Sequence, residues 1–381
     1  MTRSFILLAL LGCVCSVNGF PRNNVESKSG VYEIPVSSSL FNVEYATSIS
    51  IGSPPQSFNV IIDTASTMSF VPHKNYKSTG PVESVCENNE VYDDSKSSTS
   101  QKTGDNFDIK GSPTKGKYFK DVFAFGNGSN NLLKLKKPTK FGAADSMVCE
   151  DRSVLALGFS PKNDKSSNVV EEAISQGLLK HPMSTVFLKR CPPAVSECAG
   201  GVITLGKHDR KHCGAVIGTV KVDSQDPRLF FVDEASVGNY KHKKRVSVMS
   251  STGTSHLVLG PTFFDNIIRE TGAVQIYPGS QLYKVPCSKN IEIKFKINGV
   301  KYAVPLRELS VELANNECQI QIFRKTDDSQ NWVLGAPFIR SVCHIYDYQN
   351  RVIAFAKPGK NQPGDEYTPE KHSGNKSHKK H

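Results

Sequence analysis

The sequence predicts a mostly β protein built of two lobes, and three observations support this prediction. Short runs of β-branched and aromatic residues, broken by Gly, Pro, Asn and Asp, recur along the 381 residues, which is typical of strands joined by turns. The chain is long enough for two lobes that each bury a core. One pattern also occurs twice: an apolar strand leads into a tight turn of small hydroxyl residues at 61–66 and again at 248–255.

The elements follow from local patterns. Strands are predicted at 44–51, 58–62, 202–205, 229–232 and 352–355, where β-branched and aromatic residues dominate. Helices are predicted at 169–176 and 261–270, where apolar residues recur at helical spacing. We divide the chain into a short N-terminal segment at 20–43, an N-terminal β lobe at 44–210, a C-terminal β lobe at 211–356 and a disordered basic tail at 357–381.

The first residues predict export. Arg3 precedes an apolar run at 5–11, and small residues continue to Gly19, which is typical of a secretory signal peptide at 1–19. No other apolar run approaches the length that crosses a membrane. We therefore expect a soluble, secreted protein that acts as a monomer.

The cysteines predict disulfides rather than a metal site. Of the ten cysteines, Cys13 and Cys15 would leave with the signal, and an even number in an exported chain favours disulfides. No CxxC pair occurs, and no histidine stands at zinc spacing from a cysteine, so we expect no metal and no cofactor. Cys191 and Cys198 would close a small hairpin, whereas the pairs Cys213–Cys343 and Cys86–Cys149 are weaker suggestions.

The net charge is +11, and much of it is clustered. The clusters are Lys110, Lys115, Lys117 and Lys120; Lys134, Lys136, Lys137 and Lys140; and residues 241–245. They could attract an acidic partner or an anionic glycan, or they could simply be a solvated surface. No signature of a nucleic-acid-binding fold accompanies them. Asn127 and Asn375 begin Asn-x-Ser sequons, which predict N-glycosylation.

The duplicated turns resemble the two active-site loops of the pepsin-like aspartic proteases. The pattern of that family is two hydrophobic residues followed by Asp-Thr-Gly-Ser or Asp-Thr-Gly-Thr, once per lobe. The first turn here has Asp63 and Thr64 but places Ala65 at the glycine position. The second turn has Ser251 at the aspartate position, followed by Thr252, Gly253 and Thr254.

The resemblance extends over nearly the whole chain after the signal. Matching segments are the opening strand at 45–56, the loop-supporting strands at 154–158 and 332–335, the exit of the second loop at 254–261, and the closing strands at 337–347 and 353–356. The first supporting strand has Ala156 where glycine is usual. The resemblance implies a bilobal fold with a cleft between two β-rich lobes, and a disulfide between Cys287 and Cys318.

The resemblance also identifies what the chemistry lacks. Aspartic proteolysis uses two carboxylates about 3 Å apart that share one proton. One takes a proton from water while the other donates to the scissile carbonyl. Ser251 can donate a hydrogen bond, but its hydroxyl does not change protonation near neutral pH, and Asp63 alone is expected to be ionised there. Thr64 and Thr252 are expected to form hydrogen bonds between the lobes.

Two other parts of the family's machinery differ. A Gly-rich hairpin, the flap, covers the cleft of family members with a tyrosine. The matching residues 107–116 have Lys110 near the tyrosine position, followed by Gly111, and Phe70 replaces a supporting tryptophan. The segment ahead of the first family strand is short, and its residues 30–36 resemble a remnant of a cleft-filling propeptide.

Three hypotheses follow. The first is a secreted pseudo-protease that binds a peptide, protein or anionic ligand through its cleft or basic surface. The second is an active aspartic endopeptidase that uses Asp63 and an unrecognised second acid, with Asp233, Glu234, Asp265 and Glu270 as the acids we considered. The third is a structural or storage secretory protein.

Overall fold

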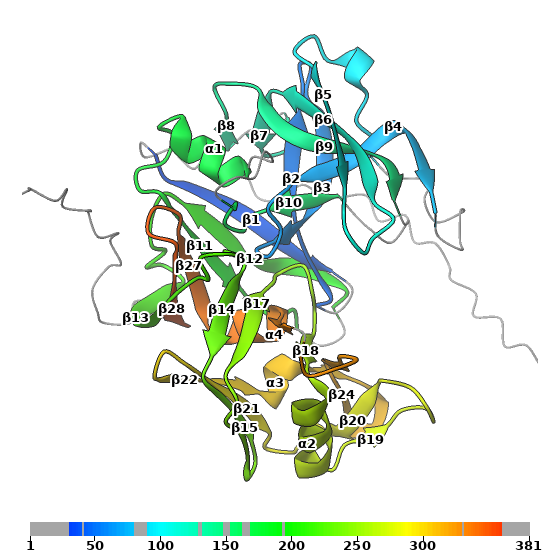
Figure 1. The fold of residues 1–381 in the computed structure, drawn as a ribbon, viewed down its shortest axis with the longest axis vertical. Helices are drawn as coiled ribbons and strands as arrows, with labels where there is room; N and C mark the ends of the chain where they lie inside the picture. Colours follow the sequence, from blue (N-terminus) through cyan, green and yellow to red (C-terminus); the bar gives the residue numbers. More distant parts are fainter. Residues whose placement is uncertain are drawn as a thin grey trace, which may run out of the picture.

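The computed structural model describes residues 30–39, 42–79, 90–128, 132–147, 153–161, 168–192, 195–329 and 331–359. It confirms a mostly β, bilobal architecture, with strands β1 to β28 and four short α-helices among the described residues. In Figure 1 the strands β2 to β10 form one end of the molecule, and β15, β19 to β22 and β24 form the other. The predicted signal peptide at 1–19 and all but the first three residues of the predicted tail at 357–381 lie outside the described residues.

The largest sheet runs through both halves of the chain, in the order β13-β28-β27-β11-β12-β1-β2-β3-β10-β4-β9-β6-β5, with β7 paired to β2 and β8 paired to β7. Its strands are β1 (Tyr32–Ser39), β2 (Glu44–Ile51), β3 (Gln56–Asp63), β4 (Phe70–Ser78), β5 (Gln101–Asp108), β6 (Lys115–Asp121), β7 (Phe123–Phe125), β8 (Leu133–Lys134), β9 (Thr139–Met147), β10 (Val154–Ala156), β11 (Met183–Leu188), β12 (Glu197–Leu205), β13 (Cys213–Lys221), β27 (Cys343–Asp347) and β28 (Val352–Pro358). The expected boundary between residues 210 and 211 therefore falls within a shared sheet.

Three smaller sheets complete the second half. One contains β14 (Leu229–Val232), β17 (Val246–Ser250), β26 (Trp332–Leu334), β18 (Leu257–Leu259) and β25 (Ile322–Arg324), in that order. A second contains β16 (Tyr240–His242), β15 (Glu234–Val237), β21 (Glu292–Ile297) and β22 (Val300–Pro305). The third contains β19 (Val274–Gln275), β20 (Tyr283–Pro286), β24 (Glu317–Ile320) and β23 (Ser310–Glu312).

The two predicted helices are present as α1 (Val169–Ser175) and α2 (Pro261–Thr271). The side chain of Asn168 caps α1 by accepting from two backbone amides. Proline begins α2, and Gly272, with φ of 60°, ends it. Sequence analysis did not predict the short helix α3 (Leu306–Leu309).

The expectation of strand at 337–340 was wrong, because these residues belong to helix α4 (Ala336–Ser341). Pro337 lies in the first turn of that helix, where a missing N–H costs nothing and the fixed φ suits a helix. The strand that follows, β27, begins only at Cys343. A short helix thus separates β26, the strand beside the second loop, from the closing strands β27 and β28.

The residues that resemble a propeptide remnant form strand β1. This strand pairs with β12 along its whole length and with β2 at its end. Ile34 and Val36 are buried in the main core. Residues 32–39 therefore lie in the central sheet rather than in the cleft.

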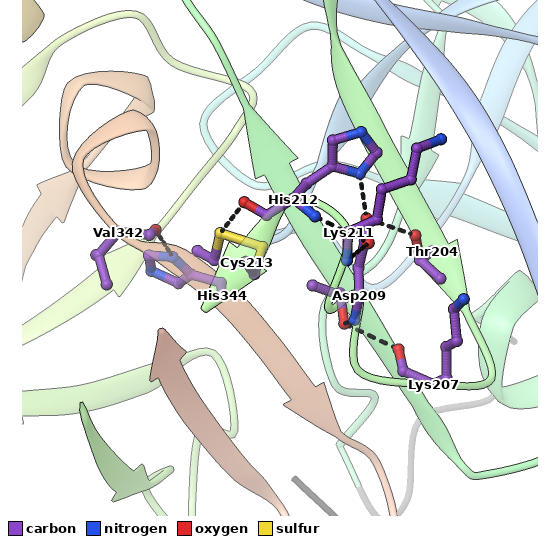
Figure 2. The surroundings of a disulfide bond; sticks show 10 residues. Thr204, Lys207, Asp209, Lys211, His212, Cys213, Val342 and His344 are labelled. Atoms are coloured by element: carbon purple, nitrogen blue, oxygen red, sulfur yellow. Dashed lines mark hydrogen bonds and ion pairs between the residues drawn. A yellow bond between two sulfur atoms is a disulfide. The ribbon is translucent and has the colours of Figure 1, made fainter. Parts of the chain in front are cut away.

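Three disulfides join cysteines at pairs that the sequence suggested: Cys191–Cys198, Cys213–Cys343 and Cys287–Cys318. Figure 2 shows the second of them, which ties the start of β13 to the start of β27 beside His344. Cys86 and Cys149 lie outside the described residues. No helix among the described residues is long and apolar enough to span a membrane.

Candidate functional site

The two duplicated turns lie at the middle of the molecule. Each follows a strand that is paired in parallel with another strand. Asp63 ends β3, which is paired in parallel with β10 so that Ala156 stands opposite Asp63. Ser251 follows β17, which is paired in parallel with β26 so that Leu334 stands opposite Ser250. By this register Ala156 occupies the place that Gly335 has in the second turn. Each loop is thus held from the side by a buried strand.

Reciprocal hydrogen bonds join the two turns through Thr64 and Thr252. The amide of Thr64 donates to Oγ1 of Thr252 at 3.2 Å, and the amide of Thr252 donates to Oγ1 of Thr64 at 3.1 Å. Each hydroxyl also donates to a carbonyl of the opposite strand, that of Ser250 at 2.9 Å and that of Ile62 at 2.6 Å. Both threonines are buried, so water does not compete for these bonds.

The carboxylate of Asp63 is surrounded by hydrogen-bond donors. Its Oδ1 accepts from the hydroxyl of Ser251 at 2.8 Å and from the amide of Ala65 at 2.9 Å. Its Oδ2 accepts from the hydroxyl of Ser66. Ser251 in turn accepts from the amide of Gly253 at 3.2 Å. At the two positions where the family pattern has carboxylates, the arrangement therefore contains one carboxylate, that of Asp63, and one hydroxyl, that of Ser251.

Gly253 is required by close approach rather than by its backbone angles. A Cβ added to it would lie 2.9 Å from Cγ of Asp63, a distance that forces something to move. Sequence analysis did not single out Ser66 as a candidate residue, although the family pattern has Ser or Thr at its position. The structure shows that this hydroxyl supplies the donor on the far oxygen of Asp63.

The turns open into a cleft of about 450 Å³. The residues that line it are Val43, Glu44, Ile61, Asp63, Ser66, Phe70, Ile109, Ser112, Thr114, Val154, Thr252, Gly253, Thr254 and Ser255. Two of these residues are acidic, and none of the described residues that line this cleft is Lys, Arg or His. The cleft is therefore acidic, in a chain whose net charge is +11. Sequence analysis did not identify Glu44 as a cleft residue.

The flap is the hairpin of β5 and β6, and its register differs from the expectation. The amide of Ile109 donates to the carbonyl of Thr114 at 2.9 Å, which closes the turn and leaves Lys110 and Gly111 exposed at its tip. Ile109 faces the cleft, whereas Lys110 and Gly111 are not among the lining residues. The side chain of this turn that meets the cleft is therefore the aliphatic one of Ile109 and not that of Lys110, which was expected near the tyrosine position.

None of the four acids considered as a second catalytic group lines the cleft. Asp265 pairs with Arg324 at 2.9 Å, and Asp233 lies 3.8 Å from Arg245. Glu270 accepts from the amide of Asn239 at 3.0 Å, and Glu234 lies within β15. Within the part of the chain that the structure describes, no group of three or more metal-ligating side chains is placed to hold a metal ion.

A buried histidine supports the second turn from behind. His344 on β27 is fully buried, with Nε2 3.0 Å from the hydroxyl of Ser250 and Nδ1 2.9 Å from the carbonyl of Val342. Figure 2 shows the contact with Val342. Burial lowers the pKa of His344 from 6.5 to about 4, because the charged imidazole would lose its hydration. Burial likewise lowers the pKa of His256 to about 4.

The fold and the paired turns define a protein of the aspartic protease class. The model of the eukaryotic aspartyl protease family matches residues 44–358, and the chain belongs to this family. Aspartic protease 6 of Caenorhabditis elegans is 29% identical over 327 residues, which are 82% of this chain and 81% of the relative. Aspartic protease 1 of the same organism is 28% identical over 93% of this chain and 98% of the relative. Embryonic pepsinogen of Gallus gallus is 28% identical over 83% and 81%.

We predict that the threonine pair stabilises the junction of the lobes. In Thr64→Val and Thr252→Val the shape is kept, but buried backbone groups lose their partners, at about 1 to 3 kcal/mol for each group. Each variant leaves one amide and one carbonyl without a partner and should lower the free energy of unfolding in urea by about 2 to 6 kcal/mol. Thr219→Val, in β13, is the control and should change it by less than about 0.5 kcal/mol. A loss in either threonine variant as small as that of the control would contradict this role of the pair.

We also predict that acid weakens the fold before carboxylates become protonated. Because folding favours neutral His344, the unfolded chain binds more protons between its own pKa near 6.5 and the folded pKa of about 4. The free energy of unfolding should therefore be constant above about pH 6.5 and fall by roughly 3 kcal/mol on acidification to about pH 4. His256 acts in the same direction.

Urea unfolding at intervals across this range measures the effect. His344→Gln should flatten the dependence, whereas His181→Gln, a half-buried control, should leave it unchanged. Stability that stays constant or rises on acidification would contradict a neutral His344.

Proposed function

We propose that this protein is a secreted, proteolytically inactive member of the family that binds an extended peptide in the retained cleft. The observation that carries the proposal is the hydroxyl of Ser251, which donates to Asp63 at 2.8 Å from the place of the second acid. General acid and base assistance is worth on the order of 10² to 10⁴ in rate. A serine hydroxyl cannot hold and return a proton in that exchange, so the loss should lie at the upper end of this range.

Binding is the capacity that this geometry retains. The cleft combines apolar side chains, among them Ile61, Phe70 and Ile109, with polar loop residues and the carboxylates of Asp63 and Glu44. An extended peptide can place alternate side chains in such a groove while its backbone forms hydrogen bonds to the walls. Because the lining is acidic, the peptide should be neutral or basic. The acidic partner expected from the net charge does not suit this cleft.

Secretion is part of the proposal. The predicted signal peptide at 1–19 and three disulfides suit an oxidising compartment outside the cytosol. Asn127 is exposed and lies after β7, outside any strand, which is a suitable context for N-glycosylation. Asn375 lies outside the described residues.

A second candidate function is favoured by one observation. Glu44 lines the same cleft as Asp63, and its Oε2 accepts from the hydroxyl of Ser39 at 3.1 Å. A carboxylate in the cleft is what an active endopeptidase with an unusual second acid would require. The arrangement favours the first proposal, because the donors on Asp63 come from Ser251, Ala65 and Ser66.

We predict that the cleft binds peptides and releases them intact. The probe is a pool of synthetic peptides of eight to ten residues cut from the casein sequence, followed by fluorescence anisotropy and mass spectrometry. Ser112→Trp would fill the cleft from the flap and should weaken binding at least about tenfold, or about 1.4 kcal/mol. Lys117→Trp lies on the same hairpin outside the lining and should bind normally. Equal binding by both variants would exclude the cleft as the site.

We predict that restoring the acid restores chemistry. The amide of Gly253 already donates to the side chain at position 251, as the amide of Ala65 donates to Asp63. In Ser251→Asp the new carboxylate should therefore find a backbone donor already in place. Cleavage of unfolded casein at acidic pH should rise at least about 10²-fold above the wild type. Ser251→Asn, which has the same shape without the acid, should stay at the wild-type level. No gain in Ser251→Asp would show that the second acid is not what limits this protein.

A further inference from the structure

The four-stranded sheet of β16, β15, β21 and β22 has one buried face and one exposed face. Ala235, Ile293 and Phe295 belong to the buried face, with Tyr302 and Val304 of β22. Since successive side chains of a strand point to opposite faces, the residues between them point outward. In Figure 1 β15, β21 and β22 lie at the edge of the molecule, away from β4, β5 and β6.

Lysines dominate the exposed face. The strand register places Lys241, Ser236, Lys294 and Ala303 in one row across the sheet. The next row contains Glu234, Lys296 and Lys301. The adjoining turn adds Lys243, Lys244 and Arg245, all exposed. We call Lys241, Lys243, Lys244, Arg245, Lys294, Lys296 and Lys301 the lysine sheet.

Few acids offset these charges. Glu292 lies 3.2 Å from Lys294, Asp233 lies 3.8 Å from Arg245, and Glu234 stands opposite Lys296 in the sheet, so three acids face seven basic residues. Among the residues that the structure describes, Lys241, Lys296 and Lys301 form no ion pair. Lys296 and Lys301 are direct cross-strand partners, and like charges in that arrangement destabilise a sheet. A ligand with several negative charges would relieve this repulsion.

The other side chains of this face indicate which polyanion it suits. Between the lysines stand Ser236 and Ala303, so the face carries neither aromatic rings that could stack on bases nor large apolar side chains. Single-stranded nucleic acid and membrane insertion both depend on such groups. A protein partner would need a central apolar anchor. What remains is a flat array of point charges, with strands about 5 Å apart and outward residues about 7 Å apart along a strand.

We propose that the lysine sheet binds a linear sulfated polysaccharide. Such a chain presents closely spaced sulfates that several lysines can contact at once. Three disulfides indicate an oxidising compartment, where sulfated glycans rather than DNA are the common polyanions. The sheet is distinct from the acidic cleft, since no residue of the lysine sheet lines it. One molecule can therefore hold a glycan and a peptide on separate surfaces.

A size-defined heparin oligosaccharide is the probe, and its binding is measured by calorimetry. The test variant replaces Lys241, Lys294, Lys296 and Lys301 with Gln. The control replaces Lys120, Lys134, Lys136 and Lys137 with Gln, so that the net charge changes equally; all four of these lysines are exposed. The test variant should bind at least about tenfold more weakly, and the control should change by less than about threefold. Equal losses in both variants, or no loss in the test variant, would overturn the proposal.

Two further measurements complete the test. Because ion pairs release counterions, the logarithm of the affinity should fall with the logarithm of salt concentration, more steeply for the wild type than for the test variant. Fully desulfated heparin should not bind. If a DNA duplex bound as tightly as heparin and lost affinity in the same variant, the surface would be a general polyanion site and the assignment to sulfated glycan would fail. Both variants should keep the thermal midpoint of the wild type, since seven of the eight substituted side chains are exposed and the eighth, Lys296, is only half-buried.

Discussion

The structure of the site depends on the reciprocal hydrogen bonds between Thr64 and Thr252. They join the end of β3 to the end of β17, and each hydroxyl both accepts from one backbone amide and donates to one carbonyl across the junction. These four buried hydrogen bonds hold the two loops side by side. They therefore determine how closely Ser251 approaches Asp63, and they keep the cleft open whether or not the site is active. For this reason the two loops can keep their arrangement even when the second catalytic acid is absent.

Much of the fold could be predicted because its signals are local. The two turns, the helices α1 and α2 and the strand β2 each carry their pattern within a few residues. The register of the flap could not be predicted in this way. Residues 107–116 allow more than one alignment, and only the closure of the turn between Ile109 and Thr114 shows which side chain faces the cleft.

Other features needed tertiary structure. Residues 30–36 precede the first family strand and resemble a propeptide remnant, yet residues 32–36 belong to β1, which pairs with β12, far away in sequence. Glu44 begins β2 and lines the same cleft as Asp63, which ends β3, and this closeness exists only in the folded chain. The lysine sheet likewise combines the cluster at 241–245, which the sequence shows, with Lys294, Lys296 and Lys301, whose placement depends on strand register. The alternation of side chains along one strand shows which residues share a face, but it does not show which strands lie next to that strand.

The central claim is that a single carboxylate in this architecture does not hydrolyse peptides. Its most direct test is the rate at which pure wild-type protein cleaves unfolded casein between about pH 3 and about pH 7, compared with Asp63→Asn prepared in the same way. We expect both rates to equal the uncatalysed background at every pH. Cleavage by the wild type that disappears in Asp63→Asn would contradict the claim, and would show that Asp63 acts together with a second acidic group.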